Sequence, residues 1–138
     1  NVVFHQQFEG PVGYFTLAND AIKLNDSEKF ELGFGEQVEL AAFPAVKIGR
    51  LAVHQDLHRK GVGAALMTLL LGDILNTAGL SAARLIVVDA DNDDAVLRFY
   101  EKLGFETSLW AEEMARNHTK KRAKPQTIKM HRDVFKGL

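Results

Sequence analysis

The chain has 138 residues, of which 46% are hydrophobic and 25% are charged. That length and balance suit one domain, residues 1–138, and exclude disordered, collagen-like and coiled-coil proteins. The chain has no cysteine, which excludes disulfides, cysteine-bound metal centres and a thiol nucleophile, and it indicates a reduced, cytoplasmic setting. We expect no membrane association, because no apolar run approaches the roughly 18 residues of a membrane span and no signal peptide opens the chain.

The net charge of −1 conceals a strong asymmetry along the chain. Residues 1–115 hold 9 Lys and Arg against 17 Asp and Glu, whereas residues 116–138 hold 8 against 1. The basic residues gather in a loop at about 114–126, which is either a solvated surface loop or a segment that attracts polyanions. Because the first residue is Asn1 rather than Met, we expect the chain to be part of a longer protein.

The first half of the chain reads as strands. Residues 1–8 and 12–17 are expected to pair as a hairpin around the turn at Gly10 and Pro11. A further strand is expected near 21–24, followed by a loop or a short helix, and another strand over 46–53.

The second half alternates helices and strands. Apolar residues at helical spacing begin at Val62, and we expect Gly79 to end that helix. The apolar run 85–88 predicts a strand covered on both faces. The remaining elements are a helix capped by Asn92 or Asp93 and stopped by Gly104, then strands near 105–110 and 127–132 joined by the basic loop. The strand–helix–strand crossover implies a parallel pair within a mixed α/β sheet.

The loop His58-Arg59-Lys60-Gly61-Val62-Gly63-Ala64 is the most informative feature, because it joins a strand to a helix start. The glycines permit a close backbone approach to a ligand, and free amides at a helix N-terminus favour an anion. The pattern predicts a phosphate or pyrophosphate site, although the glycines also suit simple chain reversal. A dinucleotide fingerprint fits poorly because position 66 is Leu, and no Gly-Lys-Ser or Gly-Lys-Thr makes a P-loop.

A second block runs from Asp89 through Phe99-Tyr100 to Gly104-Phe105. Tyr100 is a candidate proton donor, because a phenol with a pKa near 10 can act as a general acid. The alternative is a core aromatic residue, since Tyr100 shares a helical stripe with Phe99 and Leu103.

The two blocks together resemble the N-acetyltransferase superfamily often called GNAT, from about Val2 to the end of the chain. Gly61 and Gly63 match the family's pyrophosphate loop, whereas His58 stands where the family has Gln or Arg. The resemblance implies a mostly antiparallel sheet with a central parallel strand pair flanked by helices. The family's first strand and first helices have no counterpart here.

The resemblance also implies the co-substrate and its contacts. Acetyl-coenzyme A (acetyl-CoA) would bind beside the strand that ends at Val53, with Tyr100 next to the thioester sulfur as the acid. The residues expected to bind it are Leu51, Ala52, Val53, His58, Arg59, Lys60, Gly61, Val62, Gly63, Ala64 and Asn92.

Other chemistries fit less well. Asp89, Asp91 and Asp93 alternate like calcium ligands, but an EF-hand loop counted from Asp89 would need Gly at 94 and Glu at 100. His54 and His58 lack a third ligand, so we expect no metal site. No serine has the context of an acyl-enzyme hydrolase. No carboxylate lies within the strand 48–53 to act as a general base, and Glu36 and Glu39 are the nearest weak candidates.

Residues 13–17, 44–53 and 99–100 are similar to acetyltransferase toxins of bacterial toxin–antitoxin pairs. Those proteins acetylate the amino acid on charged transfer RNA, which implies charged tRNA and an antitoxin protein as partners. Arg50, Lys120, Lys121 and Arg122 would then face the RNA. A housekeeping acetyltransferase, a non-catalytic CoA-binding regulator and a homodimeric state remain open.

Overall fold

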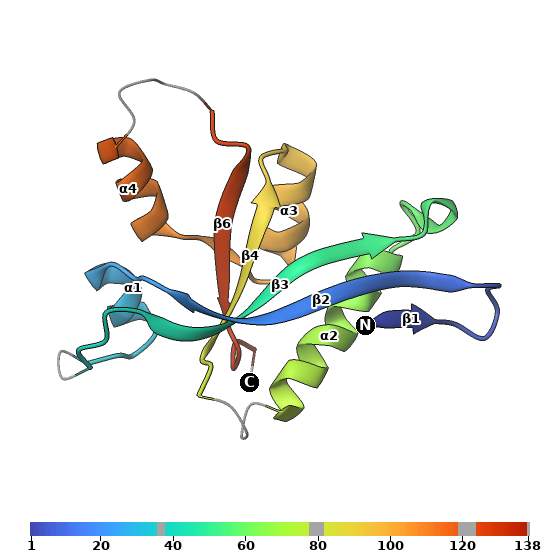
Figure 1. The fold of residues 1–138 in the computed structure, drawn as a ribbon, viewed down its shortest axis with the longest axis horizontal. Coiled ribbons are helices and arrows are strands. Elements are labelled where there is room, and N and C mark those ends of the chain that lie inside the picture. The colour runs from blue at the N-terminus through green and yellow to red at the C-terminus, as the bar shows by residue number, and fades with distance from the viewer. Residues whose placement is uncertain (36–37, 78–81, 119–123, 138) are drawn as a thin grey trace.

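The computed structural model describes residues 1–35, 38–77, 82–118 and 124–137. It shows a twisted six-stranded sheet with the strand order β1-β2-β3-β4-β6-β5 and helices on both faces (Figure 1). The strands are β1 Val2–Phe4, β2 Pro11–Ile22, β3 Phe43–Val53, β4 Leu85–Asp91, β5 Glu106–Thr107 and β6 Thr127–Asp133. The helices are α1 Asp26–Glu31, α2 Val62–Thr77, α3 Asp94–Lys102 and α4 Leu109–His118, with a short 3-10 turn at Gln55–Leu57.

The amino-terminal hairpin is confirmed. β1 pairs antiparallel with β2, and Gly10 adopts a positive φ of 84° in the connecting turn, a conformation that glycine adopts without strain. β2 is longer than predicted and continues to Ile22. The separate strand expected near 21–24 is therefore wrong, because Ala21 and Ile22 extend β2, which stays paired with β3 from Gly13 to Ile22.

A β-bulge in β3 marks the centre of the sheet. Thr16 pairs with Arg50, whereas the next residue, Leu17, pairs with Ile48, so Gly49 has no partner on β2. A Cβ at position 49 would lie 2.8 Å from the Thr16 hydroxyl oxygen, which explains the glycine. A bulge bends its strand and increases the local twist.

β4 lies at the centre of the hydrophobic core, as predicted. Leu85 and Val87 face one side, where they pack with Phe43, and Ile86 and Val88 face the other. All four are at most 1% exposed. β4 pairs parallel with β3 and antiparallel with β6, so the mixed, mostly antiparallel sheet with a central parallel pair is confirmed.

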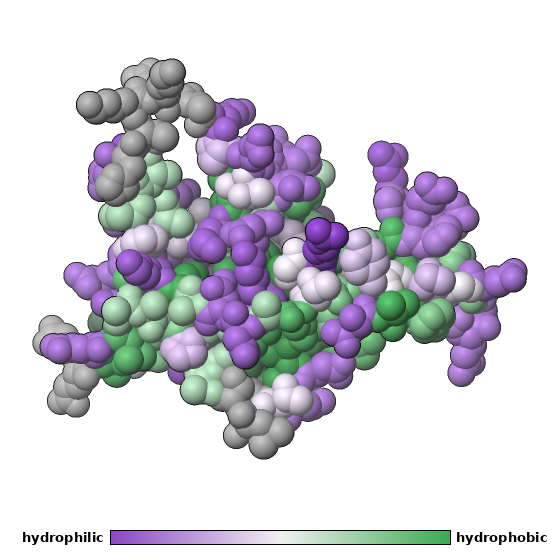
Figure 2. Space-filling view, in the orientation of Figure 1, coloured by the Kyte–Doolittle hydropathy of each residue, from purple (hydrophilic) through white to green (hydrophobic). Residues whose placement is uncertain are grey.

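The helices divide between the two faces of the sheet. α2 and α3 pack against the Ile86 side, and α1 lies with α4 on the other side (Figure 1). α2 buries Leu66 and Leu70 but leaves Leu69 54% exposed. Gly79, the expected end of α2, lies outside the described residues. Figure 2 shows a mostly polar surface over α3 and hydrophobic surface below β2, toward α2.

The strand predicted near 105–110 is only partly correct. β5 is two residues long, and α4 begins at Leu109 and continues over 114–118, the first part of the segment predicted as a basic loop. The Glu28 carboxylate accepts hydrogen bonds from the backbone N–H groups of Leu109 and Trp110 at 3.3 and 3.0 Å. It also contacts His131 Nε2 at 2.7 Å. A buried carboxylate from α1 thus caps the first turn of α4.

Candidate active site

A cleft opens where the two parallel strands part. β3 and β4 pair only from Ala45–Ile48 to Leu85–Val88, yet β3 continues to Val53 and β4 to Asp91. Beyond the bulge at Gly49 the facing edges of both strands lack a strand partner on that side. A cleft of about 1010 Å³ lies there, and the start of α2 and one side of α3 complete its walls.

Most of the residues expected at the site line this cleft. They are Arg50, Leu51, Ala52, Val53, His58, Arg59, Gly61, Val62, Gly63, Ala64 and Tyr100. Segments from β3, the loop before α2 and α3 therefore meet, although they are far apart in the sequence.

The loop before α2 has the geometry of an anion site. Gly61 has a φ of +74° and Arg59 a φ of +62°, which is a strained conformation for a residue with a Cβ. The first hydrogen bond of the helix runs from the Ala65 N–H to the Gly61 carbonyl. The N–H groups of Val62, Gly63 and Ala64 precede this ladder and are available to an anion at the positive end of the helix dipole.

Helix α2 packs against α3 at Gly63. A Cβ at this position would lie 3.6 Å from the Phe99 ring and 3.7 Å from a Val53 methyl group, which is ordinary van der Waals contact. The position thus suits glycine or alanine, as the family pattern expects.

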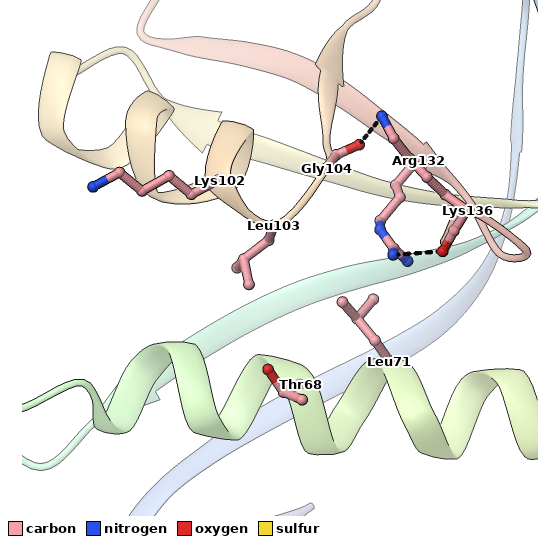
Figure 3. Close-up of a pocket in the computed structure, with 7 residues that line it drawn as sticks. All are labelled: Thr68, Leu71, Lys102, Leu103, Gly104, Arg132 and Lys136. Atoms are coloured by element: carbon pink, nitrogen blue, oxygen red, sulfur yellow. Dashed lines mark hydrogen bonds between the residues drawn. The ribbon is translucent and has the colours of Figure 1, made fainter. Parts of the chain in front are cut away.

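Helix α3, which carries Tyr100, is fixed at both ends. Asp93 caps α3 by accepting hydrogen bonds from the Ala95 and Val96 N–H groups at 2.9 and 3.3 Å. At the other end, Gly104 has a φ of +86° and its carbonyl accepts a hydrogen bond from Lys136 Nζ at 3.0 Å (Figure 3). These contacts hold α3 in one orientation along the cleft.

A second, smaller cavity of about 380 Å³ adjoins this anchor. Figure 3 shows Leu71 and Thr68 of α2 along one side of it and the Lys102 side chain pointing away from it. Arg132 donates a hydrogen bond to the Lys136 carbonyl at 2.9 Å. Lys136 therefore secures the turn after α3, and Arg132 holds the backbone of Lys136.

The Tyr100 ring packs edge-on against Phe99 and Phe105, with centroid distances of 5.2 and 5.5 Å. Burial raises the pKa of the Tyr100 phenol, and the negative charge of Asp91 raises it further. The phenol is therefore protonated across the neutral range and can donate a proton. Among the described residues its hydroxyl has no hydrogen-bond partner, which leaves it available to a ligand in the cleft.

Two carboxylates in the cleft wall were missed as site residues. Asp89 forms ion pairs with Lys47 Nζ at 2.6 Å and Lys129 Nζ at 3.2 Å, which link β3, β4 and β6 where the strands part. Desolvation acts to raise the pKa of Asp89, but the hydrogen bonds and charges of both lysines lower it overall. Asp91 also lines the cleft. The alternation of these residues was considered only as a calcium motif, and nothing local relates them to Tyr100.

Several expected site residues lie elsewhere. Lys60 is exposed and does not line the cleft. Asn92 uses its side-chain amide to donate to the Pro125 carbonyl at 2.9 Å, which ties the end of β4 to the start of β6 instead of facing the cleft. Glu39 is exposed and is not part of the cleft wall. Glu36, Lys120, Lys121 and Arg122 lie outside the described residues.

Within residues 1–35, 38–77, 82–118 and 124–137, no three His, Cys, Asp or Glu side chains are grouped so as to hold a metal ion. The helices of the same ranges are all too short or too polar to cross a membrane.

Comparison with known structures agrees with this geometry. The fold is similar to a bacterial toxin, with a TM-score of 0.64 at 15% identity, over 90% of this chain and 60% of that one. It is similar to the toxin AtaT complexed with acetyl-methionyl-tRNAfMet (TM-score 0.66, 17% identity, 90% and 63% coverage). A mutant AtaT bound to the C-terminus of the antitoxin AtaR and acetyl-CoA gives a TM-score of 0.58 at 17% identity, with 90% and 59% coverage.

The chain therefore spans about 60% of the length of these neighbours, and at such low identity the likeness shows the fold. A family model described as the acetyltransferase (GNAT) domain matches residues 8–107, which is most of the chain and includes the glycine loop and Tyr100. The chain belongs to the GNAT acetyltransferase family.

Proposed function

We propose that this chain transfers the acetyl group of acetyl-CoA to a primary amine, and that the amine is the amino group of an aminoacyl-tRNA. The observation that carries the proposal is the cleft between β3 and β4, which has an anion loop at one end and Tyr100 in its wall. Acetylation of charged tRNA blocks translation, so the chain would act as a toxin in the cytoplasm, where charged tRNA is found.

The cleft fits acetyl-CoA in three respects. The free amides of Val62 to Ala64 and the charge of Arg59 suit a pyrophosphate. The edge of β3 beyond Gly49 offers unpaired backbone groups to an extended ligand with amide bonds, in the manner of an added strand. Leu51 and Val53 provide apolar contacts along the same wall.

Acetyl-CoA supplies an activated acyl group. The residues of the cleft position this group, and Tyr100 donates and takes up the proton that the reaction transfers. Backbone N–H groups on the edge of β3 stabilise the negative charge that develops on the thioester oxygen during amine attack. The new C–N bond forms as the C–S bond breaks, and Tyr100 donates its proton to the departing sulfur. The attacking nitrogen carries a positive charge after attack, and it gives a proton to the Tyr100 phenolate as it becomes an amide, which restores the phenol.

Two observations favour charged tRNA as the acceptor. AtaT, which has a similar fold, is known in complex with acetyl-methionyl-tRNAfMet. The strongly basic segment 116–138 suits a polyanion such as RNA, and Arg50 lines the cleft. Because the AtaT toxin also binds the C-terminus of an antitoxin, we propose an antitoxin as the second partner of this chain.

The proposal is tested with the purified chain in a cell-free translation reaction, with and without acetyl-CoA. We expect translation to stop only with acetyl-CoA, and N-acetylated aminoacyl-tRNA to accumulate. If small amines or protein termini are acetylated while charged tRNA stays unmodified, a housekeeping transferase is the better description. If acetyl-CoA binds and no free thiol is released with any acceptor, the chain is a CoA-binding regulator.

A further inference from the structure

Asp91 differs from the other carboxylate in the cleft wall because it lacks a partner. Asp89 is neutralised by Lys47 and Lys129. Asp91 is exposed, and its carboxylate has no ion pair or hydrogen bond within the part of the chain that the structure describes. An anion that lines a cleft with no protein counter-ion is available to a positively charged ligand.

The position of Asp91 relates it to the reacting end of the cleft. It lies at the end of β4, two residues beyond Asp89, so both side chains project from the face of the sheet that Leu85 and Val87 share, opposite to the face that α3 covers. Asp91 and Tyr100 still line the same cleft, because it opens between the parted strands, and the charge of Asp91 raises the pKa of the Tyr100 phenol. The anion loop at Gly61 lies on the other wall, at the start of α2.

The cationic groups of the cleft wall lie on other segments. Arg50 is on β3 and Arg59 is in the loop before α2, and among the described residues neither forms an ion pair with Asp91. The cleft wall therefore carries the unpaired carboxylate of Asp91 on β4, and the guanidinium groups of Arg50 and Arg59 on β3 and in the loop. Asp91 suits a cationic group of a ligand, and the loop suits an anionic one.

We propose that Asp91 binds the ammonium group of the acceptor amine, so that the acceptor enters the cleft as a cation. This inference rests on the proposed acetyltransferase function and names the residue that selects its acceptor. Asp91 holds the nitrogen beside Tyr100, and the proton lost before attack passes through the open side of the cleft to water.

The test compares Asp91→Asn with the matched control Asp94→Asn, which removes the same charge from an exposed residue outside the cleft wall. Each protein is saturated with CoA, which has no acetyl group to transfer, and titrated with methionine methyl ester by calorimetry. We expect Asp91→Asn to weaken binding of this ammonium probe about tenfold or more, because a charge-assisted hydrogen bond is lost. Asp94→Asn should bind the ammonium probe as the wild type does. The three proteins should have the same affinity for the neutral N-acetylmethionine methyl ester.

Steady-state kinetics separates this inference from the function on which it rests. Asp91→Asn should raise KM for the amine while KM for acetyl-CoA changes less than twofold. Equal amine affinity in wild type and Asp91→Asn, or no binding of the probe by wild type, overturns the inference while acetyl transfer by wild type would still stand. Failure of wild type to bind CoA overturns the proposed function itself.

Discussion

The imidazole Nε2 of His58 lies 2.8 Å from the carbonyl oxygen of Val53, the last residue of β3. A carbonyl only accepts hydrogen bonds, so Nε2 carries the hydrogen in this contact. The ring thereby ties the loop before α2 to the end of β3. His58 occupies the position of a family Gln or Arg, and its visible contribution is to hold the loop in place.

Replacement of His58 tests this anchoring role. His58→Ala removes one hydrogen bond with a net value of about 0.5–1.5 kcal/mol, so we expect CoA binding to weaken about two- to tenfold. His58→Gln retains a donor that can reach the Val53 carbonyl and should bind CoA close to the wild-type level. Calorimetric titration with CoA measures both, and wild-type affinity in His58→Ala would contradict the anchoring role.

The two loop glycines should respond differently to alanine. Gly61 has a φ of +74°, where a Cβ costs about 1–2 kcal/mol, so Gly61→Ala should distort the loop and weaken CoA binding about tenfold. Gly63→Ala is the control, because its Cβ meets only ordinary contacts. The dissociation constants for CoA are the readout, and an equal loss in both variants would show that backbone conformation at Gly61 is unimportant.

The ion pair between Arg84 and Asp133 should make stability depend on pH. Arg84 Nε and Nη2 each donate to one carboxylate oxygen at 2.8 Å, joining the start of β4 to the end of β6. The hydrogen bonds from Arg84 are the main reason that the pKa of Asp133 is lowered, and they outweigh desolvation. The stabilisation is complete above the unfolded pKa of about 3.9 and is lost as the pH falls through the lower folded value.

Asp133→Asn should therefore reduce the free energy of unfolding by about 1–2 kcal/mol at pH 7. The difference in the free energy of unfolding between Asp133→Asn and wild type should disappear as the pH approaches 2. Asp73→Asn, at an exposed position on α2, serves as the control and should stay within about 0.5 kcal/mol of wild type. Urea unfolding at several pH values measures this, and a pH-independent gap would argue against the ion pair as its cause.

Local signals account for the parts of the fold that the sequence predicted. The hairpin was predicted from the turn at Gly10. The central strand 85–88 was predicted from an apolar run, and its residues are buried in the structure. α4 was missed because its first amides bond to Glu28, a residue 81 positions earlier than Leu109. Ser108, whose hydroxyl accepts from the Ala111 N–H at 3.2 Å, was a local helix-start signal that the strand interpretation overlooked.

The site residues likewise fall into those that a local sequence pattern predicts and those that only the folded structure brings together. The loop at Gly61 and Gly63 and helix α3 have local patterns, and the structure brings them to one cleft. Asp91 has no such pattern, because its relation to Tyr100 arises only when β4 and α3 fold back on each other. The role of Gly49 was equally hidden, since a bulge depends on the register with β2.

The most direct test of the account is Tyr100→Phe, measured for both kcat and CoA affinity. The phenol supplies the proton to the departing thiolate, so its loss should lower kcat by about 100-fold or more. The ring contacts with Phe99 and Phe105 need no hydroxyl, so the dissociation constant for CoA should stay within twofold of wild type. Unchanged kcat in Tyr100→Phe would contradict the assignment of this cleft as the site of acetyl transfer with Tyr100 as its acid.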